Sequence, residues 1–180
     1  MITEAKAKQL LDRMLERARK AGAEAAATVW ASRGGNTLFA NMYAAYDALP
    51  EDLKRRLEGR RALNVYDYDN SPTLRAAVRE DAPRFVHPVV RTHPETGRKA
   101  LYINIGHTAR FEGWTEEESA PLLNFLHQHQ IKAEFTCRFQ WRVGSLALWD
   151  NRAALHYPIN DYHGHRRIMH RITLKGDRPR

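Results

Sequence analysis

The chain has 180 residues and a mass of 20.8 kDa, a length that a single domain usually fills. Hydrophobic residues make up 43% and charged residues 28%, and the mean hydropathy is -0.64, which argues against a disordered or membrane-embedded chain. No run approaches the roughly 20 apolar residues that span a bilayer, and residues 1–20 lack the apolar core of a signal peptide. We therefore expect a cytoplasmic protein without a membrane partner.

The cysteine count and the net charge narrow the class further. Cys137 is the single cysteine, which excludes an internal disulfide framework and a cysteine-based zinc site. The 29 basic and 21 acidic residues give a net charge of +8, which favours an anionic partner. Charge alone leaves open whether that partner is a nucleic acid or a small acid.

The N-terminal half is expected to be mainly helical. Apolar residues recur at helical spacing from Leu10 to Ala18, and Gly22 is a plausible stop for that helix. After the Gly34-Gly35 break, a second helical block is expected over residues 38–49. Pro50 suits the first position of a third helix, over residues 51–58.

A hairpin and a further helix follow. Residues 86–92 and 99–104 are expected to form two strands that are joined by turn chemistry at residues 94–97. Thr115 and Glu118 match a capping box, which predicts a helix ending near His129. We expect Pro121 to bend or delay this helix, and we place His127 and His129 at its end on the surface.

The C-terminal part has the periodicity of antiparallel strands. Between residues 135 and 143, apolar and polar side chains alternate strictly, with Cys137 and Trp141 on the apolar side. Further strands are predicted over residues 146–149, 153–157 and 167–174. The fold class is therefore α+β.

The last predicted strand carries two arginines at positions that share one face. Because side chains alternate along a strand, Arg167 and Arg171 point the same way, about 13 Å apart. This spacing suits two separate anionic groups. In the more common arrangement Ile168 and Ile172 face the core and both arginines face water. The alternation alone favours this second arrangement.

One constellation is more specific than these patterns. It comprises Trp149-Asp150-Asn151-Arg152, His156-Tyr157 and the run from Arg166 to Arg171, and it extends back through residues 135–141, 116–126, 87–98 and 34–43. Together these motifs closely resemble the taurine/alpha-ketoglutarate dioxygenase family (TauD/TfdA) over about residues 33–180. We accordingly divide the chain into residues 1–32, a non-family N-terminal helix and connector, and residues 33–180, a partial family domain.

The resemblance implies a fold, a reaction and cofactors. Members are jelly-roll (double-stranded β-helix) enzymes that use non-haem Fe(II), 2-oxoglutarate and O2 to hydroxylate small, often anionic, substrates of sulfonate or carboxylate type. Their iron is held by two histidines and one carboxylate. For this chain the implied fold is a partial jelly roll with flanking helices that lacks the family's first strands.

Four residues match the family's functional positions, and a fifth, His107, lies at such a position with a different residue type. His156 resembles the distal iron histidine, and Arg167 resembles the arginine that pairs with the far carboxylate of 2-oxoglutarate. Thr37 matches a threonine that touches the same carboxylate. Arg171 matches an arginine that meets an anionic substrate group or helps seat the cosubstrate. His107 falls where taurine-cleaving members have a substrate-lining phenylalanine, which argues against taurine as substrate.

The family's other two iron ligands come from a His-x-Asp or His-x-Glu motif ahead of the Gly-Gly-Asn-Thr segment. This chain has no histidine before His87, and the His-x-Glu at His93 is expected to be hairpin turn. Asp161, His163 and His165 could form a substitute cluster, although a loop of this composition is usually solvated. One imidazole cannot hold Fe(II), so iron binding is doubtful and we expect no dioxygenase turnover from this chain alone.

Three functional alternatives remain. The first is a truncated dioxygenase, whose exposed strand edges would favour self-association. The second is a metal-independent module in which Arg167 and Arg171 hold a small dicarboxylate or sulfonate. The third is a nucleic-acid-binding domain, suggested by the net charge and by the basic residues between Lys54 and Arg61. Interleaved acidic residues argue against the third and favour a solvated helix face.

Overall fold

The computed structural model describes residues 25–31, 34–66, 80–142, 144–165, 167–173, 176, 178 and 179. The helix expected before Gly22 lies outside these residues. The chain divides into two compact units. Unit 1 combines residues 1–40 with residues 136–178, and unit 2 comprises residues 41–135 with the last two residues.

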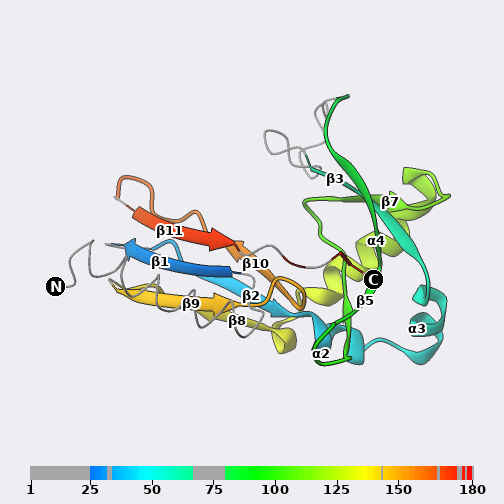
Figure 1. The fold of residues 1–180 in the computed structure, drawn as a ribbon. Helices are drawn as coiled ribbons and strands as arrows, with labels where there is room; N and C mark the ends of the chain where they lie inside the picture. Colours follow the sequence, from blue (N-terminus) through cyan, green and yellow to red (C-terminus); the bar gives the residue numbers. More distant parts are fainter. Residues whose placement is uncertain are drawn as a thin grey trace. The chain divides into compact units, whose positions relative to one another are not determined.

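Unit 1 contains two three-stranded sheets (Figure 1). In the first, β1 (Ala25–Ala31) lies between β11 (Arg167–Thr173) and β9 (Ser145–Trp149) and is antiparallel to both. In the second, β2 (Thr37–Asn41) lies between β10 (Ala154–Pro158) and β8 (Thr136–Phe139), and β2 is antiparallel to β8. Strands far apart in sequence are therefore neighbours in both sheets.

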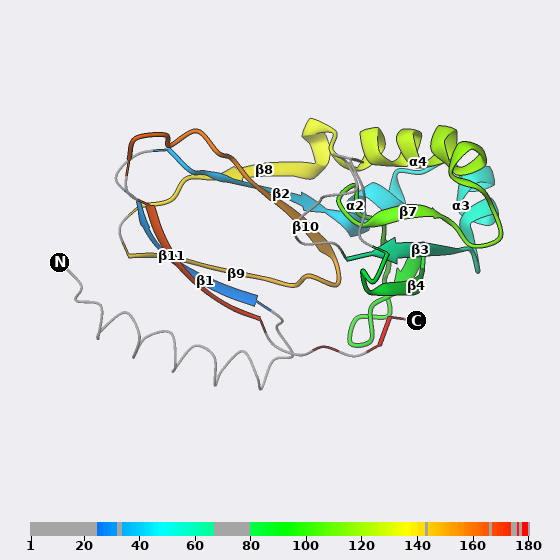
Figure 2. The same cartoon turned by 90° about the horizontal axis from the view of Figure 1, so that it is seen from above.

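The two sheets of unit 1 form two layers, as Figure 2 shows. Aromatic side chains connect the layers, because the rings of Phe39 on β2 and Trp149 on β9 have centroids 5.2 Å apart. Met169 of β11 and Trp149 also pack in the apolar cluster around the buried Trp141. Met169 shares a strand face with Arg167 and Arg171, so this face of β11 is the one that the cluster contacts.

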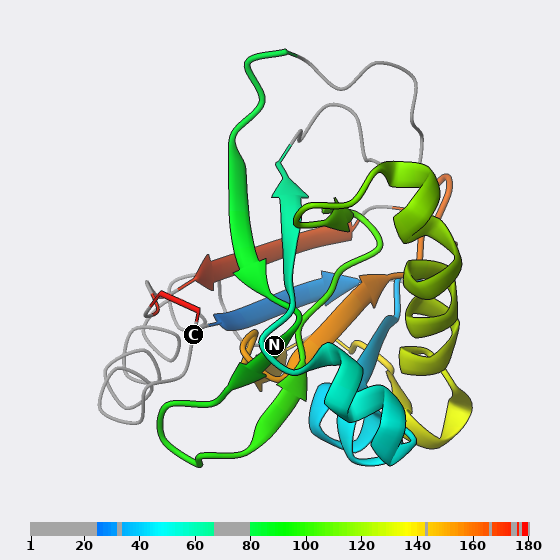
Figure 3. The same cartoon turned by 90° about the vertical axis from the view of Figure 1, so that its right-hand side faces the viewer.

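Unit 2 is built around a sheet in which β3 (Arg61–Val65) lies between β4 (Arg84–Pro88) and β7 (Thr108–Phe111). The hairpin of β5 (Val90–Thr92) and β6 (Lys99–Leu101) forms a second, two-stranded sheet, and α2 (Met42–Asp47) lies against β6. Figure 3 shows α2 and α3 (Glu51–Leu57) in cyan and α4 (Glu116–Gln130) in yellow-green. A short 3-10 helix, η1 (Ala133–Phe135), follows α4. Leu57, Phe111 and Leu126 are at the centre of the core.

The α+β class is confirmed, but the described residues of the N-terminal half are not mainly helical, contrary to the expectation. The helical block predicted over residues 38–49 is a strand followed by a short helix. Pairing with β8 holds residues 37–40 in the extended conformation, which overrides local helix propensity. The Asn41 side chain then accepts hydrogen bonds from the backbone N–H groups of Tyr43 and Ala44 and begins α2.

Other boundaries also differ from the prediction. The strand expected over residues 86–92 is divided into β4 and β5, because β4 pairs with β3 while β5 pairs with β6. The strand expected from residue 135 is confined to β8, where Cys137 is exposed, although Trp141 beyond it is buried. Pro50 is the N-cap of α3 and not its first helical residue.

The capping box at Thr115 and Glu118 is confirmed, and α4 starts directly after it. Pro121 lies inside the helix and does not delay its start. His127 and His129 are buried, which corrects the expectation of a surface position. The His129 ring is hydrogen-bonded through Nε2 to the carbonyl oxygen of Ala45 at 2.7 Å, so contact with α2 explains its burial. Among the described residues, no helix combines the length and the apolar character needed to cross a membrane.

Candidate anion-binding site

Thr37 begins β2 directly after the tight Gly34-Gly35-Asn36 turn. Both glycines have a φ of 66°, in the left-handed region that favours glycine. Thr37 is only 4% exposed, and its Oγ1 accepts a hydrogen bond from the indole Nε1 of Trp141 at 2.9 Å. Because the indole occupies an acceptor position of the hydroxyl, the hydroxyl proton remains available for donation to a ligand.

Arg167, at the start of β11, lies against the same turn. Its Nη2 donates to the carbonyl oxygen of Gly35 at 3.0 Å, and its guanidinium carbon lies 5.0 Å from the centroid of the Tyr162 ring. Its Nε is buried and has no hydrogen-bond partner in the described part of the chain. The expectation that this arginine faces water is therefore wrong. A buried, unsatisfied guanidinium donor fits a carboxylate, which accepts such donors well.

Arg171 and His156 lie near the Trp149 ring. The guanidinium carbon of Arg171 is 5.8 Å from the ring centroid, and the His156 ring centroid is 5.1 Å from it. Arg171 is exposed, as the arrangement with water-facing arginines predicted for it. Burial lowers the pKa of His156 below its usual value of 6.5, and the nearby charge of Arg171 lowers it further. His156 is therefore a neutral imidazole at pH 7.

The turn between β9 and β10 fixes the positions of Trp149 and His156. Arg152 is buried and binds Asp150 with its Nε and Nη2, the shortest contact being 2.6 Å. The indole Nε1 of Trp149 donates to the Asn151 side chain at 2.7 Å. These local bonds hold Trp149 at the end of β9 and lead the chain into β10, which carries His156.

Among the described residues of unit 1, both arginines of β11 lack a carboxylate partner. Asp150 pairs with Arg152, and the Asp161 carboxylate lies 3.6 Å from Arg138. Within the described ranges, neither Arg167 nor Arg171 forms an ion pair with a carboxylate. This part of unit 1 is therefore electropositive and suits an anion.

The same residues do not fit a three-ligand iron site. Within the described ranges, no group of three His, Cys, Asp or Glu side chains could hold a metal ion. His163 and His165 are exposed, and Asp161 binds the backbone of Gly35. Among the described residues of this site, His156 is thus a single candidate ligand.

Two predictions from the sequence concern residues of unit 2. Within the β5–β6 turn, the Nδ1 of the buried His93 accepts hydrogen bonds from the backbone N–H groups of Glu95 and Thr96, which agrees with the predicted hairpin role. His107 stacks on Tyr66 with ring centroids 4.7 Å apart, and burial lowers its pKa. The structure therefore brings four of the five predicted site residues into unit 1, while His107 belongs to unit 2.

Three residues of this site were not found from the sequence. The sequence pattern places Trp141 in an alternating strand and Asp161 in a polar loop, as a candidate for the substitute metal cluster or a solvated residue. It indicates no role for Tyr162. Their contacts with Thr37, Gly35 and Arg167 join positions more than 100 residues apart, except for the local Tyr162 contact. The Asp-Tyr pair six and five residues before Arg167 was the available signal for the last contact.

The fold and site define a protein of mixed helices and antiparallel sheets with an electropositive centre. The family model described as "Taurine catabolism dioxygenase TauD, TfdA family" matches residues 24–173. The chain belongs to this family. The matched range includes β1, so this strand lies within the family region, ahead of the motifs quoted above.

Two curated relatives show the chemistry found in this family. The alpha-ketoglutarate-dependent sulfate ester dioxygenase of Pseudomonas putida is 38% identical over 158 residues, covering 81% of this chain and 52% of the relative. The alpha-ketoglutarate-dependent 2,4-dichlorophenoxyacetate dioxygenase of Cupriavidus pinatubonensis is 40% identical over 148 residues, covering 80% of this chain and 51% of the relative. The chain thus spans about half the length of these curated relatives.

A solved structure agrees with the assignment to this family. AAD-2 in complex with Mn(II) and N-oxalylglycine is similar to this chain with a TM-score of 0.78 and 30% identity. The similarity covers 87% of this chain and 65% of AAD-2.

Proposed function

We propose that this chain binds the distal carboxylate of 2-oxoglutarate through Arg167 and Thr37. The observation that carries the proposal is the Arg167 Nε, which is buried and unsatisfied within the described residues. Thr37 supports it with a hydroxyl that Trp141 leaves free to donate. Alpha-ketoglutarate dependence of the relatives and N-oxalylglycine in the AAD-2 structure agree with a ligand of this class.

The reaction that we propose for the family domain is hydroxylation of a small anionic substrate of sulfonate, sulfate ester or carboxylate type. Relatives act on a sulfate ester and on an aryloxyacetate, by their names. Arg171 would meet the anionic group of the substrate. The substrate-lining role of His107, a residue of unit 2, stays a prediction. His156 would supply one imidazole to the metal.

We further propose that this chain alone does not turn over substrate. The described residues contain no three-ligand group, and the sequence contains no histidine before His87. The two three-stranded sheets support the interpretation of unit 1 as a partial jelly roll. Its outer strands would favour self-association, and turnover would need further iron ligands from outside these residues. A cytoplasmic location stays a prediction.

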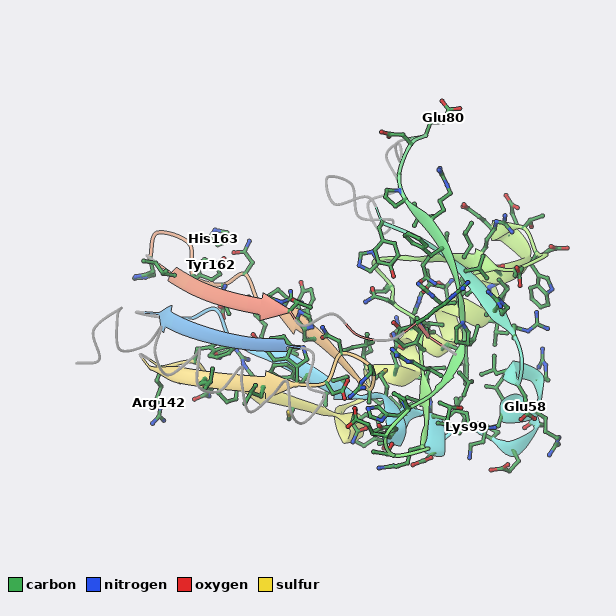
Figure 4. All side chains as sticks on the ribbon, viewed as in Figure 1. Glu58, Glu80, Lys99, Arg142, Tyr162 and His163 are labelled. Carbon is green, nitrogen blue, oxygen red and sulfur yellow. The ribbon has the colours of Figure 1, made fainter. Side chains whose placement is uncertain are left out.

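The decisive experiment is calorimetric titration of the purified protein with 2-oxoglutarate under anaerobic conditions, with and without Fe(II). We expect saturable binding that Arg167→Ala abolishes and that iron does not strengthen. Arg142→Ala is the matched control, because it removes the same charge at an exposed position (labelled in Figure 4). Absence of binding to the unmodified chain would refute the cosubstrate site. A visible charge-transfer band on adding Fe(II) would refute the incomplete metal site.

The metal-independent binding module remains the second candidate, favoured by the two uncompensated arginines. It predicts that succinate or a small sulfonate competes with 2-oxoglutarate in the absence of metal. The nucleic-acid alternative rests on the basic run from Lys54 to Arg61 in unit 2, two members of which lie near carboxylates. Lys54 pairs with Glu51 at 2.8 Å, and Arg61 lies 3.5 Å from Glu112. A salt series of gel-retardation assays tests it directly.

A further inference from the structure

The backbone N–H and the carbonyl oxygen of Gly35 both form hydrogen bonds with side chains. The Gly35 N–H donates to Asp161 Oδ1 at 2.5 Å, while the Gly35 carbonyl oxygen accepts from Arg167 Nη2 at 3.0 Å. The backbone N–H of Ile159 also donates to the carbonyl oxygen of Asn36 at 2.8 Å. Three contacts therefore connect the turn before β2 with residues 159–167, so the position of the turn and that of Arg167 depend on each other.

The contact leaves no space for a side chain at either glycine. A Cβ on Gly34 would lie 2.8 Å from Asp161 Oδ1 and 2.9 Å from its carbonyl oxygen. A Cβ on Gly35 would collide with Arg167 Nε, and it would lie 2.7 Å from Arg167 Cδ and 3.1 Å from the Tyr162 ring. The glycine turn thus acts as a closely fitted wall along the Arg167 side chain.

Tyr162 covers a face of the guanidinium. Its ring centroid lies 5.0 Å from the guanidinium carbon, within the range of a cation–π contact. Tyr162, labelled in Figure 4, belongs to the loop before β11. Because the ring covers a face and Gly35 takes one Nη2 donor, the remaining in-plane donors are left for a ligand.

Asp161 does not neutralise the arginine that it helps to position. Its carboxylate binds the Gly35 N–H and lies 3.6 Å from Arg138, with no ion pair to Arg167 among the described residues. A carboxylate paired directly with Arg167 would compete with an anionic ligand for the same donors. Binding to the backbone avoids this competition.

We infer that Asp161 and Tyr162 are positioning residues that fix the Arg167 guanidinium for anion binding. Asp161 acts through the Gly35 peptide, and Tyr162 acts through its ring. This inference rests on the proposed binding of 2-oxoglutarate by Arg167 and deepens it.

The first test compares Asp161→Ala with Asp161→Asn. Asparagine keeps a side-chain oxygen that can accept the Gly35 N–H, whereas alanine does not. We expect Asp161→Ala to weaken 2-oxoglutarate binding by on the order of tenfold, since hydrogen bonds of this kind are worth about one factor of ten. We expect Asp161→Asn to stay within about twofold of the unmodified protein.

A purely electrostatic role of Asp161 predicts the opposite change in affinity. Both substitutions remove a negative charge near an anion site, so a purely electrostatic role would make both variants bind the dianion more tightly. Tighter or unchanged binding by a folded Asp161→Ala would overturn the inference. The outcomes separate the two proposals. If the unmodified chain does not bind 2-oxoglutarate, the proposed function is refuted. If Arg167→Ala is the only variant that loses binding, only the positioning role is refuted.

The second test uses variants of Tyr162, so it can be carried out even if the Asp161 variants do not fold. Tyr162→Phe keeps the ring and should bind normally, while Tyr162→Leu removes it and should bind several-fold more weakly. The Nε–H resonance of Arg167 in ligand-free protein provides an independent readout. It should be sharp in the unmodified chain and in Tyr162→Phe, and broadened in Tyr162→Leu. An unaltered resonance and unaltered affinity in Tyr162→Leu would overturn the role of Tyr162.

Discussion

The Thr37–Trp141 hydrogen bond gives a quantitative prediction that can be measured without a ligand. Thr37 is 4% exposed and Trp141 is 7% exposed, so neither partner can turn to water when the other is removed. Thr37→Val keeps the volume but leaves the indole N–H buried and unsatisfied, which costs about 1–3 kcal/mol. Trp141→Phe removes the donor and part of the ring, and it destabilises by a similar or larger amount.

The double variant isolates the hydrogen bond from the change in packing. When both partners are apolar, no buried polar group is left unsatisfied, so the double variant should be more stable than the sum of the single effects predicts. We expect a coupling free energy of about 0.5–1.5 kcal/mol. Urea unfolding followed by circular dichroism measures all four proteins, with the midpoint and the slope fitted separately.

A matched cycle provides the control. Thr108 is also buried, and its Oγ1 donates to Asn64 Oδ1 at 2.8 Å, so Thr108→Val breaks a comparable bond in unit 2. The effects of Thr108→Val and Trp141→Phe on the free energy of unfolding should be additive within about 0.5 kcal/mol, because the two sites share no hydrogen-bond partner. A Thr37–Trp141 coupling no larger than that of the control would refute the interpretation of this bond. In ligand titrations, Thr37→Val should also weaken 2-oxoglutarate binding, whereas Thr108→Val should not.

Three further predictions concern stability and assembly. Thr115→Ala removes the capping bond to Glu118 N–H at 3.2 Å, and it should lower the free energy of unfolding by about 1 kcal/mol in urea titrations. Burial lowers the pKa of His127 below its usual 6.5, so the unfolded chain takes up its proton first as the pH falls. The stability contributed by neutral His127 is therefore fully present above pH 6.5 and is lost below it; an imidazole resonance that titrates at 6.5 or higher would contradict this. The outer strands β11, β9, β10 and β8 should promote concentration-dependent self-association. Light scattering after size exclusion, at several concentrations, would disprove this by returning the monomer mass throughout.

Local signals in the sequence determined those elements whose formation depends on neighbouring residues. The capping box predicted the start of α4, and the turn residues after His93 predicted the β5–β6 hairpin. The alternating strands of the C-terminal part predicted β9, β10 and β11 within a few residues. The motifs around His156 and Arg167 were specific enough to indicate the family, which the comparisons then confirmed.

Tertiary contacts determined the structural features that such local signals do not contain. Residues 38–40 were expected to be helical, yet pairing with β8 makes them a strand. His129 is buried because a carbonyl of α2 accepts its hydrogen bond. The sequence placed Arg167 and Arg171 on one face, but only the fold made the first half-buried and left the second exposed. The physical reason is that alternation fixes the direction of a side chain along its own strand, whereas burial, hydrogen bonding and charge compensation depend on which distant segments pack against it.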